Sequence, residues 1–200
     1  MSTTPGLRER KKEATRQALH QAAVRLAVEN GLERVTIDAI ADAATVSRRT
    51  FSNYFASKED AILHREAVTT RRLLELLAAR PAAEGPWTAL SQAAIALFGE
   101  IDAGPEDVAR LRLLRHHPAL LSRQVSTYAQ MERALREVLM TRTPTLAELT
   151  AQVIAATVLT TVRVAVQAWG ERPEESLQTL VASALAVIGG AQDRGAGTPA

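Results

Sequence analysis

Apolar and polar residues follow a helical period along nearly the whole chain. In residues 7–30 the apolar positions include Leu19, Ala22 and Ala23, which lie on one face of a helix. Gly31 follows, at the position where a glycine commonly ends a helix. The pattern predicts one long first helix, preceded by a flexible arm of residues 1–6.

The next pattern is that of two short helices joined by a tight turn. Thr36 is a suitable N-cap for a helix over residues 37–44. Ser47 is a suitable N-cap for a second helix, in which Phe51 and Phe55 are four residues apart and share a face. Residues 7–56 are therefore expected to form one helix-turn-helix domain.

Residues 57–80 predict a connecting helix. Ser57 begins it, and Asp60 stands at the position that completes a capping box. The loop PAAEGP at residues 81–86 then separates this helix from the rest of the chain.

The remaining chain is also helical, without the alternation of a strand. Apolar spacing predicts helices over residues 90–101, 106–116 and 118–144. Residues 145–169 are apolar almost all round. Pro173 begins the final helix, whose apolar stripe carries no charge and consists of Leu177, Leu180, Val181, Ala184, Leu185 and Ile188. The fold class is therefore all-α, with a second domain at 86–188.

The last two helices have more apolar surface than a chain of 200 residues can cover. We expect them to pair with the same helices of a second copy in a four-helix bundle, which would make a homodimer. The alternative is that both helices lie in an intramolecular core. Residues 189–200 are expected to be a disordered tail.

Composition excludes several classes. The chain has no cysteine, which excludes disulfides and thiolate metal sites, and its net charge of +2 does not by itself indicate a nucleic-acid binder. Residues 1–10 contain no apolar signal segment, and the apolar run 153–169 is broken by Arg163 and Gln167. We expect a cytoplasmic protein that does not interact with membranes.

The second short helix carries chemistry suited to DNA. Arg48 and Arg49 are able to bond the O6 and N7 atoms of guanine, and Asn53 the corresponding edge of adenine. A hydroxyl, a phenol and an ammonium at or near the helix ends suit phosphate: Thr36, Tyr54 and Lys58. The alternative is an ordinary helical hairpin with a solvated charged face. It would account for any one of these residues alone, but not for all of them together at the spacing of a helix-turn-helix.

Residues 14–64 resemble the N-terminal domain of the TetR family of transcriptional regulators. The matching segments are AAVRLAVENG, VTIDAIADAATVS and RRTFSNYFASKEDAIL. The resemblance implies groove contacts from Arg48, Arg49, Thr50 and Ser52, and phosphate contacts from Thr36, Asn53, Tyr54 and Lys58. Base chemistry alone would let Asn53 read adenine, and we assign it to phosphate.

Three positions depart from the family pattern. Thr45 stands in the turn where glycine is common, so a positive φ there would be strained in a β-branched residue. Ser52 replaces a frequent aromatic residue, which puts a thymine-methyl contact in doubt. Ala27 replaces a usual phenylalanine, a change that concerns packing.

Catalytic signatures are missing from the sequence. It has no phosphate-binding glycine loop, nucleophile elbow or HExxH motif, and its four histidines lack the spacing of metal ligands. We therefore expect no enzyme activity, no cofactor and no metal.

The resemblance implies a small-molecule effector pocket in the C-terminal domain. Candidate lining residues are Trp87, Phe98, Arg115, Tyr128, Met131 and Arg163. Arg163 is a charge on an apolar helix, for which an ion pair with Glu100 or Glu132 is the alternative role.

The segment RLRLLRHHPALL is similar to a subgroup associated with acyl-CoA-like ligands, whose phosphates Arg110, Arg112 and Arg115 would meet. The function expected is that of a repressor which binds a palindromic operator as a homodimer and is released by an effector. The alternative is a ligand-independent DNA-binding or architectural dimer.

Overall fold

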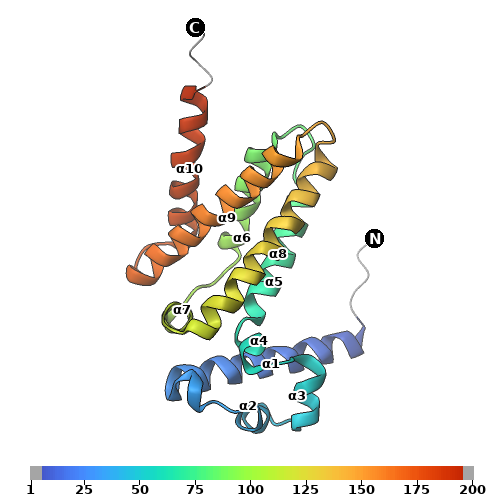
Figure 1. The fold of residues 1–200 in the computed structure, drawn as a ribbon, viewed down its shortest axis with the longest axis vertical. Coiled ribbons are helices and arrows are strands. Elements are labelled where there is room, and N and C mark those ends of the chain that lie inside the picture. Colours follow the sequence, from blue (N-terminus) through green and yellow to red (C-terminus); the bar gives the residue numbers. More distant parts are fainter. Residues whose placement is uncertain (1–5, 196–200) are drawn as a thin grey trace. The chain divides into compact units, whose positions relative to one another are not determined.

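The computed structural model describes residues 6–195, with the side chains of residue 116 and of residues 190–195 excepted. This part of the chain is helical and contains no strand, so the all-α prediction is confirmed (Figure 1). The elements are α1 (Leu7–Asn30), the 3-10 helix η1 (Leu32–Arg34), α2 (Ile37–Ala43), α3 (Arg48–Tyr54), α4 (Lys58–Ile62), α5 (His64–Ala78), α6 (Pro86–Gly99), α7 (Pro105–His116), α8 (Pro118–Arg142), α9 (Glu148–Glu171) and α10 (Leu177–Gly195).

The chain forms two compact units. The head unit comprises the chain up to residue 67 together with residues 113–124, and the body unit comprises residues 68–112 and the chain from residue 125 onward. This division differs from the predicted boundaries, because residues 113–124 were expected in the C-terminal domain. The single connecting helix predicted for 57–80 is also replaced by α4 and α5, which are separated at Leu63.

The core of the head unit is formed by α1, the two short helices, α4 and the α7–α8 junction. Phe51 and Phe55, the aromatic pair that defined the second short helix, are both buried in it. Leu114 and Leu120, which follow more than fifty residues later, are buried in the same cluster. The head unit therefore needs a segment that sequence periodicity assigned elsewhere.

Side-chain caps begin the short helices where the sequence predicts them. The Thr36 hydroxyl accepts a hydrogen bond from the Ala39 amide at 3.1 Å, and the Ser47 hydroxyl accepts one from the Thr50 amide at 3.0 Å. These bonds satisfy amides that a helix of seven residues leaves without an internal partner.

The turn between α2 and α3 keeps a left-handed residue. Thr45 has φ +57°, and its amide donates to the Asp42 carbonyl at 3.0 Å. The next amide, of Val46, donates to the Ala41 carbonyl at 2.9 Å. This pair of bonds is a Schellman motif, so the backbone retains the glycine-type turn with a β-branched residue in it.

The body unit packs α6 against α9 and α10. Its core includes Leu90, Leu97, Val158 and Val181. The last helix continues to Gly195, which corrects the predicted end at 188; the predicted disorder beyond it falls on residues 196–200, which lie outside the described residues, as does most of the predicted N-terminal arm.

Two arginines join α5 to other helices of the body unit. Arg142 on α8 donates to the carbonyls of Leu77 and Arg80 at 3.0 and 2.8 Å, in the last turn of α5 and just beyond it. Arg72 binds the Glu100 carboxylate with two hydrogen bonds, at 2.8 and 2.7 Å. This bidentate contact lowers the pKa of Glu100 below its ordinary value and raises that of Arg72.

One face of α9 is left uncovered. Ala151, Ala155 and Val158 are buried, whereas Val153 and Val164 are 54% and 51% exposed. Within a single chain α9 is therefore not buried on every side, which argues against the alternative of a purely intramolecular core. By length and composition α9 is the one described helix that would also suffice to cross a membrane.

Candidate nucleic-acid interface

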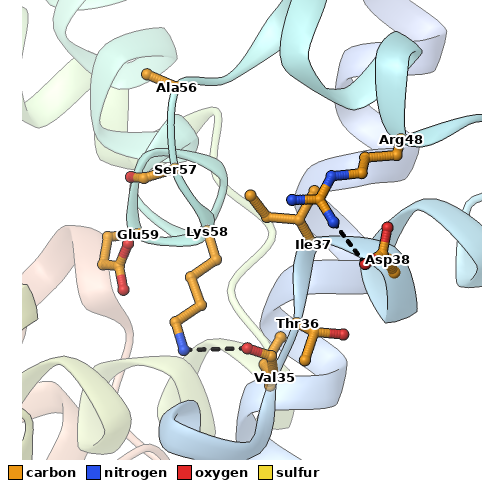
Figure 2. Close-up of a pocket in the computed structure, with 9 residues that line it drawn as sticks. All are labelled: Val35, Thr36, Ile37, Asp38, Arg48, Ala56, Ser57, Lys58 and Glu59. Atoms are coloured by element: carbon orange, nitrogen blue, oxygen red, sulfur yellow. Dashed lines mark hydrogen bonds and ion pairs between the residues drawn. The ribbon is translucent and has the colours of Figure 1, made fainter.

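A pocket in the head unit gathers three of the predicted DNA contacts. Its volume is about 480 Å³, and it is bounded by the start of α2, the start of α3 and the turn into α4 (Figure 2). The lining residues are Val35, Thr36, Ile37, Asp38, Arg48, Ala56, Ser57, Lys58 and Glu59.

Arg48, the first residue of α3, extends toward α2 (Figure 2). Its Nη1 atom donates to Oδ2 of Asp38 at 2.7 Å, and the two side chains are 65% and 58% exposed. The neighbouring Arg49 is exposed and makes no hydrogen bond or ion pair within the described residues. The two predicted base-reading arginines therefore differ, since one is held by a carboxylate and the other is free to move.

Lys58 is also engaged within the protein. Its Nζ atom donates to the carbonyls of Leu32 and Val35, at 2.8 and 3.0 Å. These contacts hold the start of α4 to η1, and they leave one of the three ammonium hydrogens for another acceptor. Sequence reasoning assigned Lys58 to phosphate and missed this structural role.

The remaining predicted contacts differ in their exposure to solvent and in the hydrogen bonds that they already make. Ser52 and Asn53 are exposed. The Thr50 hydroxyl, which is half-buried, shares a hydrogen bond of 2.8 Å with the Ser47 hydroxyl at the start of the helix. Thr36 is exposed, but its hydroxyl already serves as the cap of α2.

Tyr54 has a cationic neighbour that sequence reasoning missed. The guanidinium carbon of Arg16, on α1, lies 5.4 Å from the centre of the Tyr54 ring, and Arg16 also pairs with Glu13 at 3.1 Å. Arginine over an aromatic face is an attractive arrangement. It places a positive charge beside a phenol that was predicted to bind phosphate.

Two histidines of the head unit, His20 and His64, pack against other residues of its core. The Nδ1–H group of buried His20 donates to the Ala61 carbonyl at 2.8 Å, which joins α1 to α4. The His64 ring packs edge-on against His20 and Phe55, with ring centres 5.8 and 5.4 Å away. These are packing roles, and no group of side chains in the described residues has the composition of a metal site.

His117 follows the last residue of α7. Its Nε2 atom lies 3.0 Å from Oε1 of Glu33 in the head unit. Arg123, on α8, binds Asp60 through its Nε atom at 2.9 Å. The Asp60 carboxylate, predicted to complete a capping box, pairs with this arginine, while the Ser57 hydroxyl does accept the Asp60 amide.

The six candidate effector residues do not belong to one unit. Arg115 is exposed in the head unit, whereas the other five lie in the body unit. Trp87, Phe98, Tyr128 and Met131 are half-buried. Trp87 lies against the backbone of α10, because a Cβ atom added to Gly189 would be 3.4 Å from its indole nitrogen.

Arg163 lies on the exposed part of α9. Its Nη1 atom contacts Oε1 of Gln167 on the same helix at 3.4 Å. The ion pair considered with Glu100 or Glu132 is wrong, because Glu100 binds Arg72 and Glu132 accepts from Gln152.

Comparison with known proteins gives one family match near the start of the chain and a second over most of the remainder. Residues 19–63 match the family of bacterial regulatory proteins known as the tetR family, and residues 84–192 match the MftR C-terminal domain. The HTH-type transcriptional regulator TcmR of Streptomyces glaucescens is 34% identical over 145 residues. That match covers 69% of this chain and 64% of the relative, slightly under two thirds of its length.

Solved structures share the fold. The fatty acid degradation regulator FadR of Bacillus halodurans is 18% identical, with a TM-score of 0.61 over 93% of this chain and 96% of that one. Thermus thermophilus FadR, solved with lauroyl-CoA, is 21% identical, with a TM-score of 0.53 over 86% and 92%. NalD of Pseudomonas aeruginosa is 17% identical, with a TM-score of 0.58 over 90% and 95%. With a helix-turn-helix head and a family match over more than half of its length, the chain belongs to the TetR family of bacterial transcriptional regulators, which are not enzymes.

Proposed function

We propose that this protein is a cytoplasmic repressor that binds a palindromic operator as a homodimer and is released by a small-molecule effector. The observation that carries the proposal is the exposed side of α3, where Arg48, Arg49, Ser52 and Asn53 all reach solvent. A recognition helix of this kind enters the major groove with its N-terminal residues against base edges. Thr50 would add a further groove contact.

Phosphate contacts would hold the helix in the groove. Thr36, Asn53, Tyr54 and the free hydrogen of Lys58 are the candidates, and Arg16 adds charge beside Tyr54. Contacts of this kind fix the register of the protein on the duplex and make affinity depend on salt.

The homodimer is supported by the uncovered face of α9. A helix that exposes Leu149, Val153 and Val164 leaves apolar surface in water, which a second copy would remove. Two recognition helices would then reach successive major grooves about 34–36 Å apart. The same face makes a second copy a better explanation of the apolar α9 than a membrane.

An acyl-CoA-like molecule is the proposed effector class. Support comes from Arg110 and Arg112, which lie on α7 in the body unit, and from the lauroyl-CoA named for the Thermus thermophilus relative. Binding in the helical body would shift the helices after Ser57 and change the separation of the two recognition helices. By linkage, operator DNA and effector would weaken each other by the same factor, typically about 5–150-fold.

The experiment is selection of bound duplexes from a randomised pool at physiological salt, with the Arg48→Ala, Arg49→Ala double variant alongside. We expect the wild type alone to enrich an inverted repeat. Lauroyl-CoA, added to the complex with the enriched duplex, is expected to release it. Absence of enrichment would contradict the DNA reader, whereas enrichment without release by any acyl-CoA would favour the ligand-independent dimer.

A further inference from the structure

The ion pair between Arg48 and Asp38 joins the proposed recognition helix to the helix before it. The pair connects the first residue of α3 with the first turn of α2, and both side chains are largely in water. Arg49, the next residue, has no such partner in the described part of the chain. The contact is therefore specific to one of two adjacent arginines.

The geometry leaves most of the guanidinium available. A guanidinium has five N–H donors in a fixed plane, and the bond of 2.7 Å to Asp38 uses one of them, on Nη1. The donors on Nε and Nη2 can still meet another acceptor while the pair stays intact. Asp38 thus fixes where the charge of Arg48 lies without consuming its hydrogen-bonding capacity.

DNA offers Arg48 two kinds of acceptor, which differ in charge. A phosphate is an anion, and an anion bound to Arg48 would be repelled by the carboxylate already bound there. The O6 and N7 atoms of guanine are neutral, so they accept from the same guanidinium without that repulsion. A carboxylate on a groove-facing arginine consequently favours base edges over phosphates.

We propose that Asp38 is a positioning residue that sets the sequence specificity of this protein by keeping Arg48 away from phosphate. Random duplex binds through phosphates, which reach the remaining donors of Arg48 only against the repulsion of the Asp38 carboxylate. The base edges of the cognate operator accept from Arg48 without that repulsion. This inference rests on the proposed operator binding and adds a residue that neither contacts DNA nor lies on α3.

The chain supplies a matched control. Asp42 is one turn further along α2, and its carboxylate has no hydrogen-bond or ion-pair partner in the described region. Asp42→Asn removes the same charge from the same helix, so it reports the general repulsion between an acid and DNA. Any effect of Asp38→Asn on DNA affinity beyond that of Asp42→Asn is therefore due to the contact with Arg48.

The experiment measures affinity for the selected operator and for random duplex, over a series of salt concentrations. For Asp38→Asn we expect random-duplex affinity to rise about two- to fivefold, the range that loss of an exposed ion pair covers. Operator affinity should stay within about twofold, and the salt slope on random duplex should steepen by about one, for one more neutralised phosphate. Asp38→Glu should restore the wild-type ratio, and Asp42→Asn should leave it unchanged.

A double-mutant cycle decides whether Asp38 acts through Arg48. In the Arg48→Ala background Asp38→Asn should change binding to either duplex by no more than Asp42→Asn does, whereas in the Arg49→Ala background it should keep its full effect. Equal effects of Asp38→Asn and Asp42→Asn would overturn the proposal, and so would an excess of Asp38→Asn over Asp42→Asn that survives Arg48→Ala. So would a parallel loss on both duplexes, which indicates damage to α2; Asp38→Ser checks this with a second side chain suited to the first turn.

The same measurements distinguish failure of the proposed operator binding from failure of the role proposed for Asp38. A wild type that prefers no sequence contradicts operator binding, whatever Asp38 does. A wild type that prefers the operator while Asp38→Asn leaves the operator-to-random ratio unchanged contradicts only the role of Asp38.

Discussion

Lys58 donates a hydrogen bond from Nζ to the Val35 carbonyl at 3.0 Å, and a second to Leu32 at 2.8 Å. The residue that family resemblance assigns to phosphate is therefore also a tie between the start of α4 and the end of η1. Its replacement should affect both DNA affinity and the stability of the head unit.

We expect Lys58→Met to lower the free energy of unfolding by about 1–3 kcal/mol, because two partly buried carbonyls lose a charged donor. Urea unfolding measures this loss. DNA affinity should fall alike on all sequences, with a shallower salt dependence. An unchanged unfolding midpoint would show that the two carbonyl contacts do not stabilise the head unit, and a sequence-selective loss would contradict the phosphate role.

Thr45→Gly should stabilise the protein. Thr45 is the one described non-glycine residue with a positive φ, at +57°, and a left-handed conformation costs an L-residue about 1–2 kcal/mol. Glycine avoids that cost but loses more freedom on folding, so we expect a net gain of about 1 kcal/mol. Thermal unfolding is the measurement, with Thr45→Ala as a control that keeps the Cβ atom. A lower melting temperature for Thr45→Gly would indicate that the threonine side chain makes a compensating contact.

Leu120→Ala should destabilise the head unit although Leu120 lies far along the chain from it. Leu120 is fully buried in the cluster that contains Phe51, and removal of a buried leucine side chain costs about 2–5 kcal/mol. Its exposed neighbour gives the control, since Leu121→Ala should change stability by less than about 0.5 kcal/mol. Hydrogen exchange measures the loss of stability residue by residue, and we expect the backbone amides of α1 and α4 to exchange faster in Leu120→Ala. Equal effects of the two variants would exclude Leu120 from the head core.

Charges on the uncovered face of α9 should separate the proposed dimer. The double variant Val153→Glu, Val164→Glu would have to bury two unpaired carboxylates in the interface, so we expect a monomer by sedimentation. Val125→Glu is the control, because this valine is 70% exposed and belongs to a different helix, α8. A double variant that remains dimeric would assign the interface elsewhere.

The Arg72–Glu100 pair should contribute to acid sensitivity. The pKa of Glu100 is lower in the folded chain than its ordinary value of 4.5, chiefly because Arg72 donates hydrogen bonds to the carboxylate. The folded state therefore binds fewer protons than the unfolded state in this range. The stabilisation is fully present above pH 4.5 and is lost as the pH falls through the lowered pKa.

Melting temperatures measured from pH 7 to pH 3 test this linkage. The wild type should lose stability below about pH 4.5, and Glu100→Gln should lose less over the same range. Parallel curves for the two proteins would show that Glu100 makes no difference to acid sensitivity.

The sequence alone determined the local elements and the family. The bounds of α1, the caps Thr36 and Ser47, and the aromatic pair Phe51 and Phe55 follow from local periodicity and capping, which depend on residues a few positions apart. The same local signals placed six of the eight candidate DNA contacts on one short helix.

Tertiary structure decided which side chains meet. The pairs Arg48–Asp38, Lys58–Val35 and His117–Glu33 join residues from different elements, and no local pattern encodes them. The membership of Leu114 and Leu120 in the head core was equally hidden, because periodicity identifies the buried face of a helix but not the surface that it packs against. Thr45 depends on both sequence and tertiary structure. The sequence predicted that Thr45 lies in the turn, whereas its positive φ is fixed in the structure by the hydrogen bonds that the Thr45 and Val46 amides donate.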